Sequence, residues 1–120
     1  MKPTGTAIRH AVAYWQVALG LTDWQYTVRI GKMPAGEWGE ACVQVPYKRV
    51  EFRFSPSAMA KHGDTVDNCV VHEWGHCLVE PLAEFALKLT RNIAHRDTLT
   101  DLEERTVTDL TTLILRLHKR

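Results

Sequence analysis

The sequence has 120 residues, 45% of them hydrophobic, which is enough for one domain with a modest core. Its formal net charge of +1 gives no strongly basic surface of the kind that binds nucleic acid. No apolar run approaches the roughly 18 residues of a membrane span, and the start of the chain lacks the apolar core of a secretory signal. The three cysteines, Cys42, Cys69 and Cys77, form no CxxC pair and are odd in number. We therefore expect a single domain, residues 1–120, in a reducing cytoplasm.

The first two predicted elements are a helix and a strand. Apolar side chains recur at helical spacing over residues 6–19, and Gly20 follows as a C-cap, which predicts a helix. Residues 24–30 alternate in polarity and are rich in β-branched and aromatic side chains, which predicts a strand. Residues 33–39 contain one proline and two glycines and are interpreted as an ordinary surface loop.

Two further strands are predicted at residues 41–45 and 50–54, joined as a hairpin. In the second of them apolar and charged side chains alternate, so one face is apolar. Residues 59–63 then form a short irregular or one-turn helical passage. Together with the helices that follow, these elements predict an α+β fold with a small antiparallel sheet of about three strands.

The motif His72-Glu73-Trp74-Gly75-His76 is the feature with the clearest chemistry. On a helix this spacing puts the two histidines one turn apart on one face, where they can share a tetrahedral Zn²⁺ ion. Glu73 lies about 100° round the helix from His72, from where its carboxylate can reach a water on the metal. This arrangement is typical of a metal-dependent peptidase.

Two simpler interpretations of the motif are a solvated helix face and a structural histidine pair. The neighbours of the motif argue against the first, because a helix that is apolar on most sides is buried. Buried imidazoles and carboxylates need a partner, and a metal ion would satisfy all three polar groups at once. A metal site is therefore the favoured interpretation. The apolar neighbours are Cys69, Val70, Val71, Trp74, Cys77, Leu78 and Val79.

The helix that carries the motif should begin at Asp64 or Thr65 as N-cap. Pro81 lacks the N–H that would continue the helix, so we expect a kink or a break there and helix again up to residue 89. Residues 92–98 are predicted as a polar connection. The final predicted helix spans residues 99–117, with one apolar stripe made of Leu99, Leu102, Thr106, Leu110, Leu113, Ile114 and Leu117.

A catalytic zinc site needs a third protein ligand and leaves the fourth position for water. On the final helix Glu103 lies within the arc bounded by Leu99, Val107, Leu110 and Ile114, whereas Glu104 lies about 100° from Glu103 and points off the stripe. A carboxylate on an apolar face needs an explanation, so Glu103 is predicted as the third ligand, with Glu104 and His95 as alternatives. Glu80 follows His76 by one turn but would have to bend back past it.

These residues also carry a resemblance. It rests on three stretches: Trp15, residues 19–21 (Leu-Gly-Leu) and Trp24 near the start, residues 70–82 (VVHEWGHCLVEPL), and residues 103–107 (EERTV). In these stretches the chain resembles the small zincin-like metallopeptidases common in phages and prophages, relatives in outline of the gluzincins. The resemblance covers most of the chain loosely, and the block at 70–82 is its specific part. It implies a minimal zincin fold: an N-terminal helix, a small antiparallel sheet, the active-site helix and a C-terminal helix that supplies a glutamate ligand. In zincins extended substrate lies along a strand beside the active-site helix, which here suggests residues 41–45 or 50–54.

The chain departs from that family in two places. Leucines often fill the middle of the family's motif, where this chain has Trp74 and Gly75. In some gluzincins an acidic residue four positions after the glutamate ligand braces a zinc histidine, and no acidic residue follows Glu103 at that spacing. The outer partners of the histidines are therefore unassigned at this point.

The functional hypothesis is a zinc-dependent peptidase that acts on a peptide or protein substrate. One Zn²⁺ on His72, His76 and Glu103 lowers the pKa of water and polarises the scissile carbonyl, and Glu73 acts as general base. If the chain is phage-encoded, it would work in the cytoplasm of a bacterial host. Candidate oxyanion donors are Tyr26, Tyr47, His62 and His95.

Two other readings use the same residues. The first is a non-catalytic regulatory or interaction protein that keeps the zincin fold and the metal, since 120 residues leave little material for a deep specificity cleft. The second is a closed structural zinc site, in which Cys69 or Cys77 takes the fourth position and excludes water. A buried cysteine is more often a small hydrophobic side chain.

Overall fold

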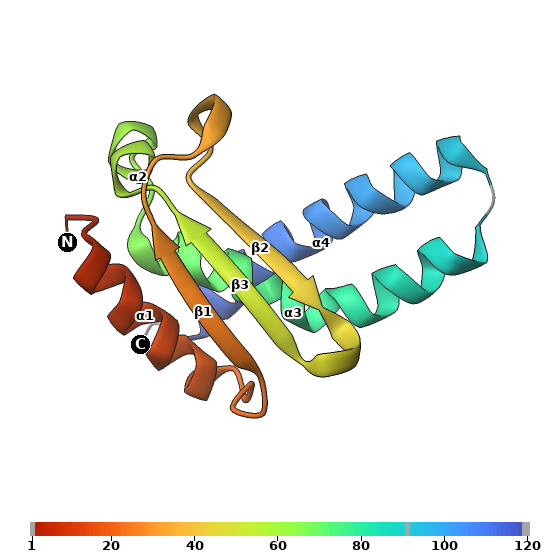
Figure 1. The fold of residues 1–120 in the computed structure, drawn as a ribbon, viewed down its shortest axis with the longest axis horizontal. Coiled ribbons are helices and arrows are strands. Elements are labelled where there is room, and N and C mark those ends of the chain that lie inside the picture. Colours follow the sequence, from red (N-terminus) through yellow and green to blue (C-terminus); the bar gives the residue numbers. More distant parts are fainter. Residues whose placement is uncertain (1, 91, 119–120) are drawn as a thin grey trace.

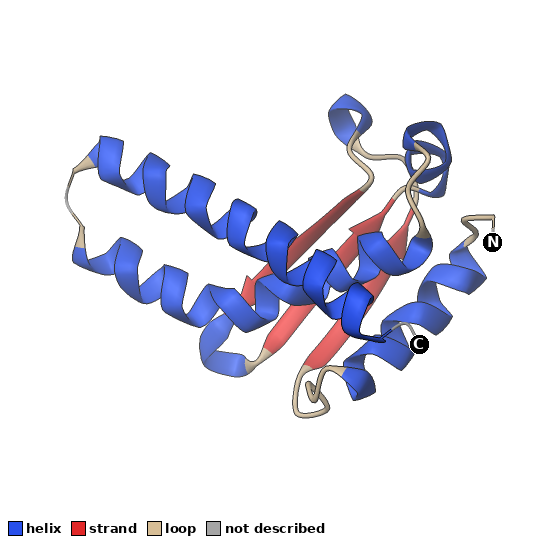
Figure 2. Cartoon of the chain, turned by 180° about the vertical axis from the view of Figure 1, so that it is seen from behind, coloured by secondary structure: helices blue, strands red, loops and turns tan. Residues whose placement is uncertain are grey.

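The computed structural model describes residues 2–90 and 92–118, which form an α+β domain with one small sheet. The helices α1, α3 and α4 all lie on one face of this sheet, and no helix of the described residues covers its other face (Figure 1, Figure 2). The described elements, in chain order, are α1 (Gly5–Ala18), β1 (Gln25–Ile30), β2 (Gly39–Gln44), β3 (Arg49–Phe54), α2 (Pro56–His62), α3 (Val66–Leu89) and α4 (Ile93–His118), with short 3-10 turns at Pro34–Gly36 and Val45–Tyr47.

Local signals account for where the first helices begin and end. The Thr4 side chain accepts a hydrogen bond from the Ala7 backbone N–H at 3.0 Å, which satisfies a free donor at the start of α1. Gly20 takes a φ of +71° just after the helix, which glycine adopts without steric cost. Thr65 caps α3 through the Asn68 N–H, also at 3.0 Å. The predicted first helix and the N-cap of the motif helix are confirmed.

The three strands form a mixed sheet in the order β1-β3-β2. β2 and β3 pair antiparallel, as the predicted hairpin requires, but β1 pairs with β3 in parallel, so the prediction of an entirely antiparallel sheet is wrong. After β1 the chain crosses to the far side of the sheet to form β2, and β3 then returns between them. Because β3 is paired on both sides, it offers no free edge to a substrate. Of the two strands suggested as a substrate shelf, only β2 is an edge strand.

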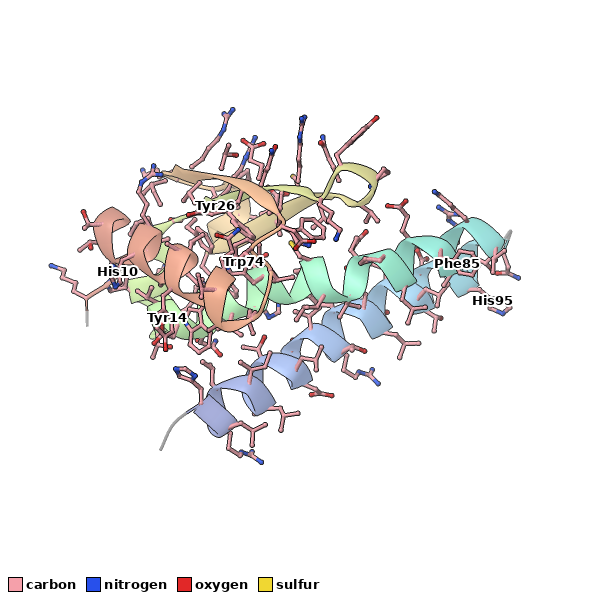
Figure 3. All side chains as sticks on the ribbon, turned by 90° about the horizontal axis from the view of Figure 1, so that it is seen from below. His10, Tyr14, Tyr26, Trp74, Phe85 and His95 are labelled. Atoms are coloured by element: carbon pink, nitrogen blue, oxygen red, sulfur yellow. The ribbon has the colours of Figure 1, made fainter. Side chains whose placement is uncertain are left out.

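The core lies between the sheet and the helices, and Trp74 is at its centre. This side chain is fully buried. Its indole ring lies 4.7 Å from the ring of Phe52 and 5.6 Å from the ring of Tyr26, measured between centroids. Its Nε1 donates a hydrogen bond to the Val12 carbonyl of α1 at 3.1 Å. Trp74 therefore ties α3 to both the sheet and α1 (Figure 3).

Helices α3 and α4 form a long antiparallel hairpin that projects beyond the sheet (Figure 1). Pro81 lies inside α3, which runs to Leu89, so of the predicted kink or break the break is wrong. The proline removes only the hydrogen bond to the carbonyl of Cys77, and the helix continues beyond it. The predicted polar connection at 92–98 is also wrong, because α4 already begins at Ile93.

The buried face of α4 differs from the predicted leucine stripe. Leu102, Leu113 and Leu117 of that stripe are 45%, 47% and 65% exposed, whereas Val107 and Thr111 are buried. Thr111 can be buried because its hydroxyl donates to the Val107 carbonyl at 2.8 Å. α4 thus packs through Val107, Thr111 and the partly buried Leu110 and Ile114, whereas Leu102, Leu113 and Leu117 of the predicted stripe face outward.

Candidate metal centre

One turn of α3 carries His72, Glu73 and His76, and a close approach of α4 brings acidic groups to it. The approach occurs at Gly75, where an added Cβ atom would lie 2.9 Å from Cγ1 of Val107. Any larger residue at this position would have to displace the buried Val107 side chain. The glycine in the middle of the motif therefore permits the helix contact that assembles the site.

Glu104 of α4 meets both histidines. Its Oε1 lies 2.7 Å from His72 Nε2, and its Oε2 lies 3.4 Å from His76 Nε2. One ligand atom from each of the three residues falls within 4.8 Å of the others. The histidine side chains are 12% and 16% exposed, whereas that of Glu104 is 59% exposed. The structure thus brings together the two predicted histidines and the alternative glutamate.

Glu103, the predicted third ligand, lies on the other side of the His76 ring. Its Oε2 is 3.0 Å from His76 Nδ1, and its side chain is 13% exposed. With His76 and Glu80 it forms a second group of ligand atoms that does not include His72. Burial and a hydrogen bond to Glu103 raise the pKa of Glu80 to about 7. A carboxylate on the second nitrogen of a metal-binding histidine fixes the ring's orientation, and the sequence had left this role unassigned.

The remaining metal-ligand candidates are not at the site. His95 lies at the far end of the α3–α4 hairpin, away from Trp74 (Figure 3), and its backbone N–H is bonded to the Asn92 side chain. Cys69 and Cys77 are buried and, within residues 2–90 and 92–118, belong to neither group of ligand atoms. Burial raises the pKa of both thiols to about 12, so they stay protonated. A closed zinc site that uses either cysteine is not supported.

Glu73 is the least exposed charged side chain near the motif, at 3%. One of its carboxylate oxygens lies 3.2 Å from where a Cβ atom would stand on Gly39 of β2, so a larger residue there would press against it. Among the described residues no hydrogen bond or ion pair reaches this carboxylate. Burial, followed by the charges of Glu104, Glu40 and Glu37, raises its pKa to about 8. Such a group takes up a proton readily once water or a ligand enters.

The site opens into a pocket of about 340 Å³ between β2, the loop before it, α3 and α4. Tyr26, Tyr47, His62 and His95, the candidate oxyanion donors, are not among its lining residues. The ring of Trp38 lies 5.5 Å from the ring of His72, edge to face. Trp38 and its acidic neighbours were not predicted as site residues, because the loop carries no sequence motif. The pocket is lined by Glu37, Trp38, Gly39, Glu40, Ala41, His72, Glu73, His76 and Glu104.

The donor set fits a zinc ion. Ligand atoms about 2.1 Å from one ion at tetrahedral angles lie about 3.4 Å apart. The separation between His76 Nε2 and Glu104 Oε2 already has this value, and the contact of His72 with Glu104 would lengthen slightly. Burial lowers the pKa of His72, which favours the neutral imidazole that a metal requires.

Comparison with known proteins adds no relative. The chain matches no family model, and no curated protein or solved structure is similar enough to match it. Over the described residues, no helix has both the length and the apolar character needed to cross a bilayer. The functional argument therefore depends on the geometry of the site.

Proposed function

We propose that this protein is a zinc-dependent peptidase in which His72, His76 and Glu104 hold the ion. One observation carries the proposal. Ligand atoms of these three residues lie within 4.8 Å of one another, and the buried carboxylate of Glu73 faces the same pocket without a hydrogen-bond partner among the described residues. Two imidazoles, one carboxylate and a free general base are the components of metal-assisted hydrolysis.

Each side chain then has a distinct task. A bound zinc ion would supply Lewis acidity and make water easier to deprotonate. Glu73 takes the proton from the attacking water and delivers it to the leaving amine, and a nearby dication lowers its pKa towards the range where it accepts protons as a carboxylate. Glu103 accepts the Nδ1 proton of His76, which leaves Nε2 free for the ion. The free edge of β2 borders the pocket and offers backbone groups to an extended peptide.

The same site could serve a protein that binds metal and a partner without cleaving anything. The pocket is small and Glu104 is 59% exposed, which leaves this regulatory or interaction role as the second candidate. For either role we propose the reducing cytoplasm of a cell, a bacterial host if a phage encodes the chain. The three cysteines are free, in agreement with such a compartment.

The first experiment separates catalysis from binding. Purified protein is loaded with zinc, its metal content is measured by elemental analysis, and a broad peptide library is digested and analysed by mass spectrometry. We expect one zinc per chain and cleavage that disappears in Glu73→Gln while the zinc stays bound. Glu84→Gln makes the same chemical change on the same helix away from the pocket and should cleave normally. One bound zinc with no cleavage of any peptide would favour the regulatory role, and equal cleavage by Glu73→Gln would remove the mechanism.

A second experiment assigns the third ligand. Zinc affinity is measured by competition with a chelator of known affinity in Glu104→Ala and Glu103→Ala. Losing an outer partner of a metal histidine typically weakens binding about 10-fold to 100-fold, so Glu103→Ala should weaken zinc binding within this range. Glu104→Ala removes a ligand and should weaken zinc binding by more than Glu103→Ala does. The reverse order would restore Glu103 as the ligand.

A further inference from the structure

We propose that the peptidase selects substrates with a lysine or arginine side chain close to the scissile bond, and that Glu37 and Glu40 bind this cation beside the indole of Trp38. The inference rests on the proposed function and names its substrate class. It follows from the charge of the pocket, from the residues at its mouth and from the position of β2.

The pocket carries more negative charge than a metal ion can neutralise. Four glutamates line it, Glu37, Glu40, Glu73 and Glu104, and none of its described lining residues is a lysine or arginine. A dication is balanced by Glu73 and Glu104, which leaves the charges of the other two. Within the described part of the chain no ion pair involves either of them. A cationic ligand would complete the charge balance.

Glu40 has a cationic neighbour in the sheet, but the two do not form an ion pair. Arg53 of β3 stands opposite Glu40 in the strand register, but the two side chains form no ion pair. Glu40 is exposed on the edge strand β2 and also lines the pocket. A residue of a strand added at the free edge of β2 would stand directly beside Glu40.

The indole of Trp38 supplies a second, independent attraction for a cation. The residue is partly buried, lies between the two glutamates along the chain and packs against His72. Tryptophan faces attract ammonium and guanidinium groups more than other aromatic rings do. Glu73 lines the same hollow, and because no buried side-chain oxygen of the described residues lacks a partner, its carboxylate keeps contact with the solvent in the pocket. Two carboxylates flanking an indole favour a basic side chain over a neutral or acidic one.

The test uses zinc-loaded protein and sets of peptides that are identical except at one position. That position is scanned across the site of cleavage and occupied by Arg, Gln or Glu. At low ionic strength kcat/KM for the best Arg peptide should exceed that of its Gln counterpart by about fivefold, the effect expected of solvent-exposed ion pairs, and the Glu peptide should be the poorest. The preference should shrink in 1 M salt, since exposed charges are then screened.

Two double variants connect the preference to the proposed residues. In Glu37→Gln/Glu40→Gln the ratio of Arg to Gln peptide should fall towards one, mainly through a higher KM for the Arg peptide. Asp101→Asn/Asp109→Asn removes the same total charge from exposed positions on α4 outside the pocket and should keep the ratio. A loss of preference in both variants would indicate a general effect of net charge and overturn the assignment.

Binding to zinc-loaded Glu73→Gln protein separates this inference from the proposed function. Affinity for the uncleaved Arg and Gln peptides is measured by calorimetry. The wild-type protein could cleave no peptide and still bind Arg peptides more tightly than Gln peptides. In that case the peptidase proposal fails and the cation site stands. If peptides are cleaved or bound without regard to charge, the cation site is wrong and the peptidase proposal survives.

Discussion

The two halves of α3 share one sequence pattern and differ in what covers them. Val71 and Phe85 lie 14 residues apart, close to four helical turns, and so fall on nearly the same face. Val71 is fully buried, whereas Phe85 is 61% exposed. The near half of α3, residues 66–77, packs against α1, the sheet and α4, whereas the far half, residues 78–89, projects beyond the sheet with α4 beside it (Figure 1, Figure 3).

The difference follows from the lengths of the elements. The 24 residues of α3 span about 36 Å, whereas strands of six residues span about 20 Å and the 14 residues of α1 about 21 Å. The covering elements therefore end before the helix does. Leu82, Phe85 and Leu89 remain open for this reason, although their spacing is that of a core face. Apolar spacing identifies a face that can be buried, and the reach of its neighbours decides whether it is.

The largest expected difference in stability is between alanine variants of Trp74 and Phe85. Trp74→Ala should lower the free energy of unfolding by about 3–5 kcal/mol, because it leaves a cavity between α1 and the sheet. Phe85→Ala should change it by less than about 1 kcal/mol, since most of that ring is already in water. Chemical denaturation followed by circular dichroism measures both. Similar losses in the two variants would mean that a partner or a second copy covers the far half.

Removal of zinc should loosen only the near half of α3, which carries the two histidines. If zinc binds as proposed, its presence at a hundredfold excess over Kd stabilises the folded chain by about 2.7 kcal/mol, which a chelator would abolish. Hydrogen exchange should then accelerate at the amides of residues 70–77 and stay unchanged at residues 82–89. Glu104→Ala is the control, since a chelator should hardly affect it. Equal acceleration along the whole helix would contradict a local metal site.

Gly75→Ala tests the contact that brings α4 to the histidines. The new methyl group meets Val107, and overpacking of this kind costs about 1–3 kcal/mol, partly offset by about 1 kcal/mol of better helix propensity. We expect a modest change in stability but weaker zinc binding, because α4 carries Glu104. Adding Val107→Ala should recover part of the zinc affinity. Unchanged affinity in Gly75→Ala would show that the close approach does not position the ligand.

The smallest effect is expected at Leu82. This side chain is 73% exposed, so Leu82→Gln should change the free energy of unfolding by no more than about 0.5 kcal/mol. The matched change at a covered position of the same helix, Val71→Gln, should be strongly destabilising, because it buries an amide without partners. Thermal melts of the two variants give the comparison. A large loss in Leu82→Gln would again indicate that something covers the far half.

Local patterns predicted most of the fold and half of the candidate site. Capping residues and alternating strands located the first helix, the hairpin and the start of α3, because these signals act over a few residues. The parallel pairing of β1 with β3 carries no local signal, since it depends on which side of the sheet the chain crosses to. Pro81 costs α3 the one hydrogen bond that would reach the Cys77 carbonyl, and the helix nevertheless continues on both sides of the proline.

The choice between Glu103 and Glu104 shows where sequence reasoning ends. The helical angle predicts that Glu103 faces α3, and its side chain is 13% exposed there, whereas that of Glu104 is 59% exposed. Both carboxylates nevertheless reach the histidines: Glu104 lies at the Nε2 atoms of His72 and His76, and Glu103 lies at the Nδ1 atom of His76. Which ring nitrogen each carboxylate meets depends on how α4 is placed against α3, and residue spacing does not give that placement. The acidic lining from Glu37 to Glu40 was unpredictable for a similar reason, because its place beside α3 exists only once the sheet has formed.

The sequence by itself determined that His72 and His76 share a helix face with Glu73 one step away, since helical geometry follows from spacing alone. It also determined the α+β class and the buried character of the motif. Only the tertiary structure decided which glutamate meets the histidines, which strand keeps a free edge and how much of α3 is covered. These features depend on how whole elements rotate and end against one another, and side chains distant in the chain set those contacts together.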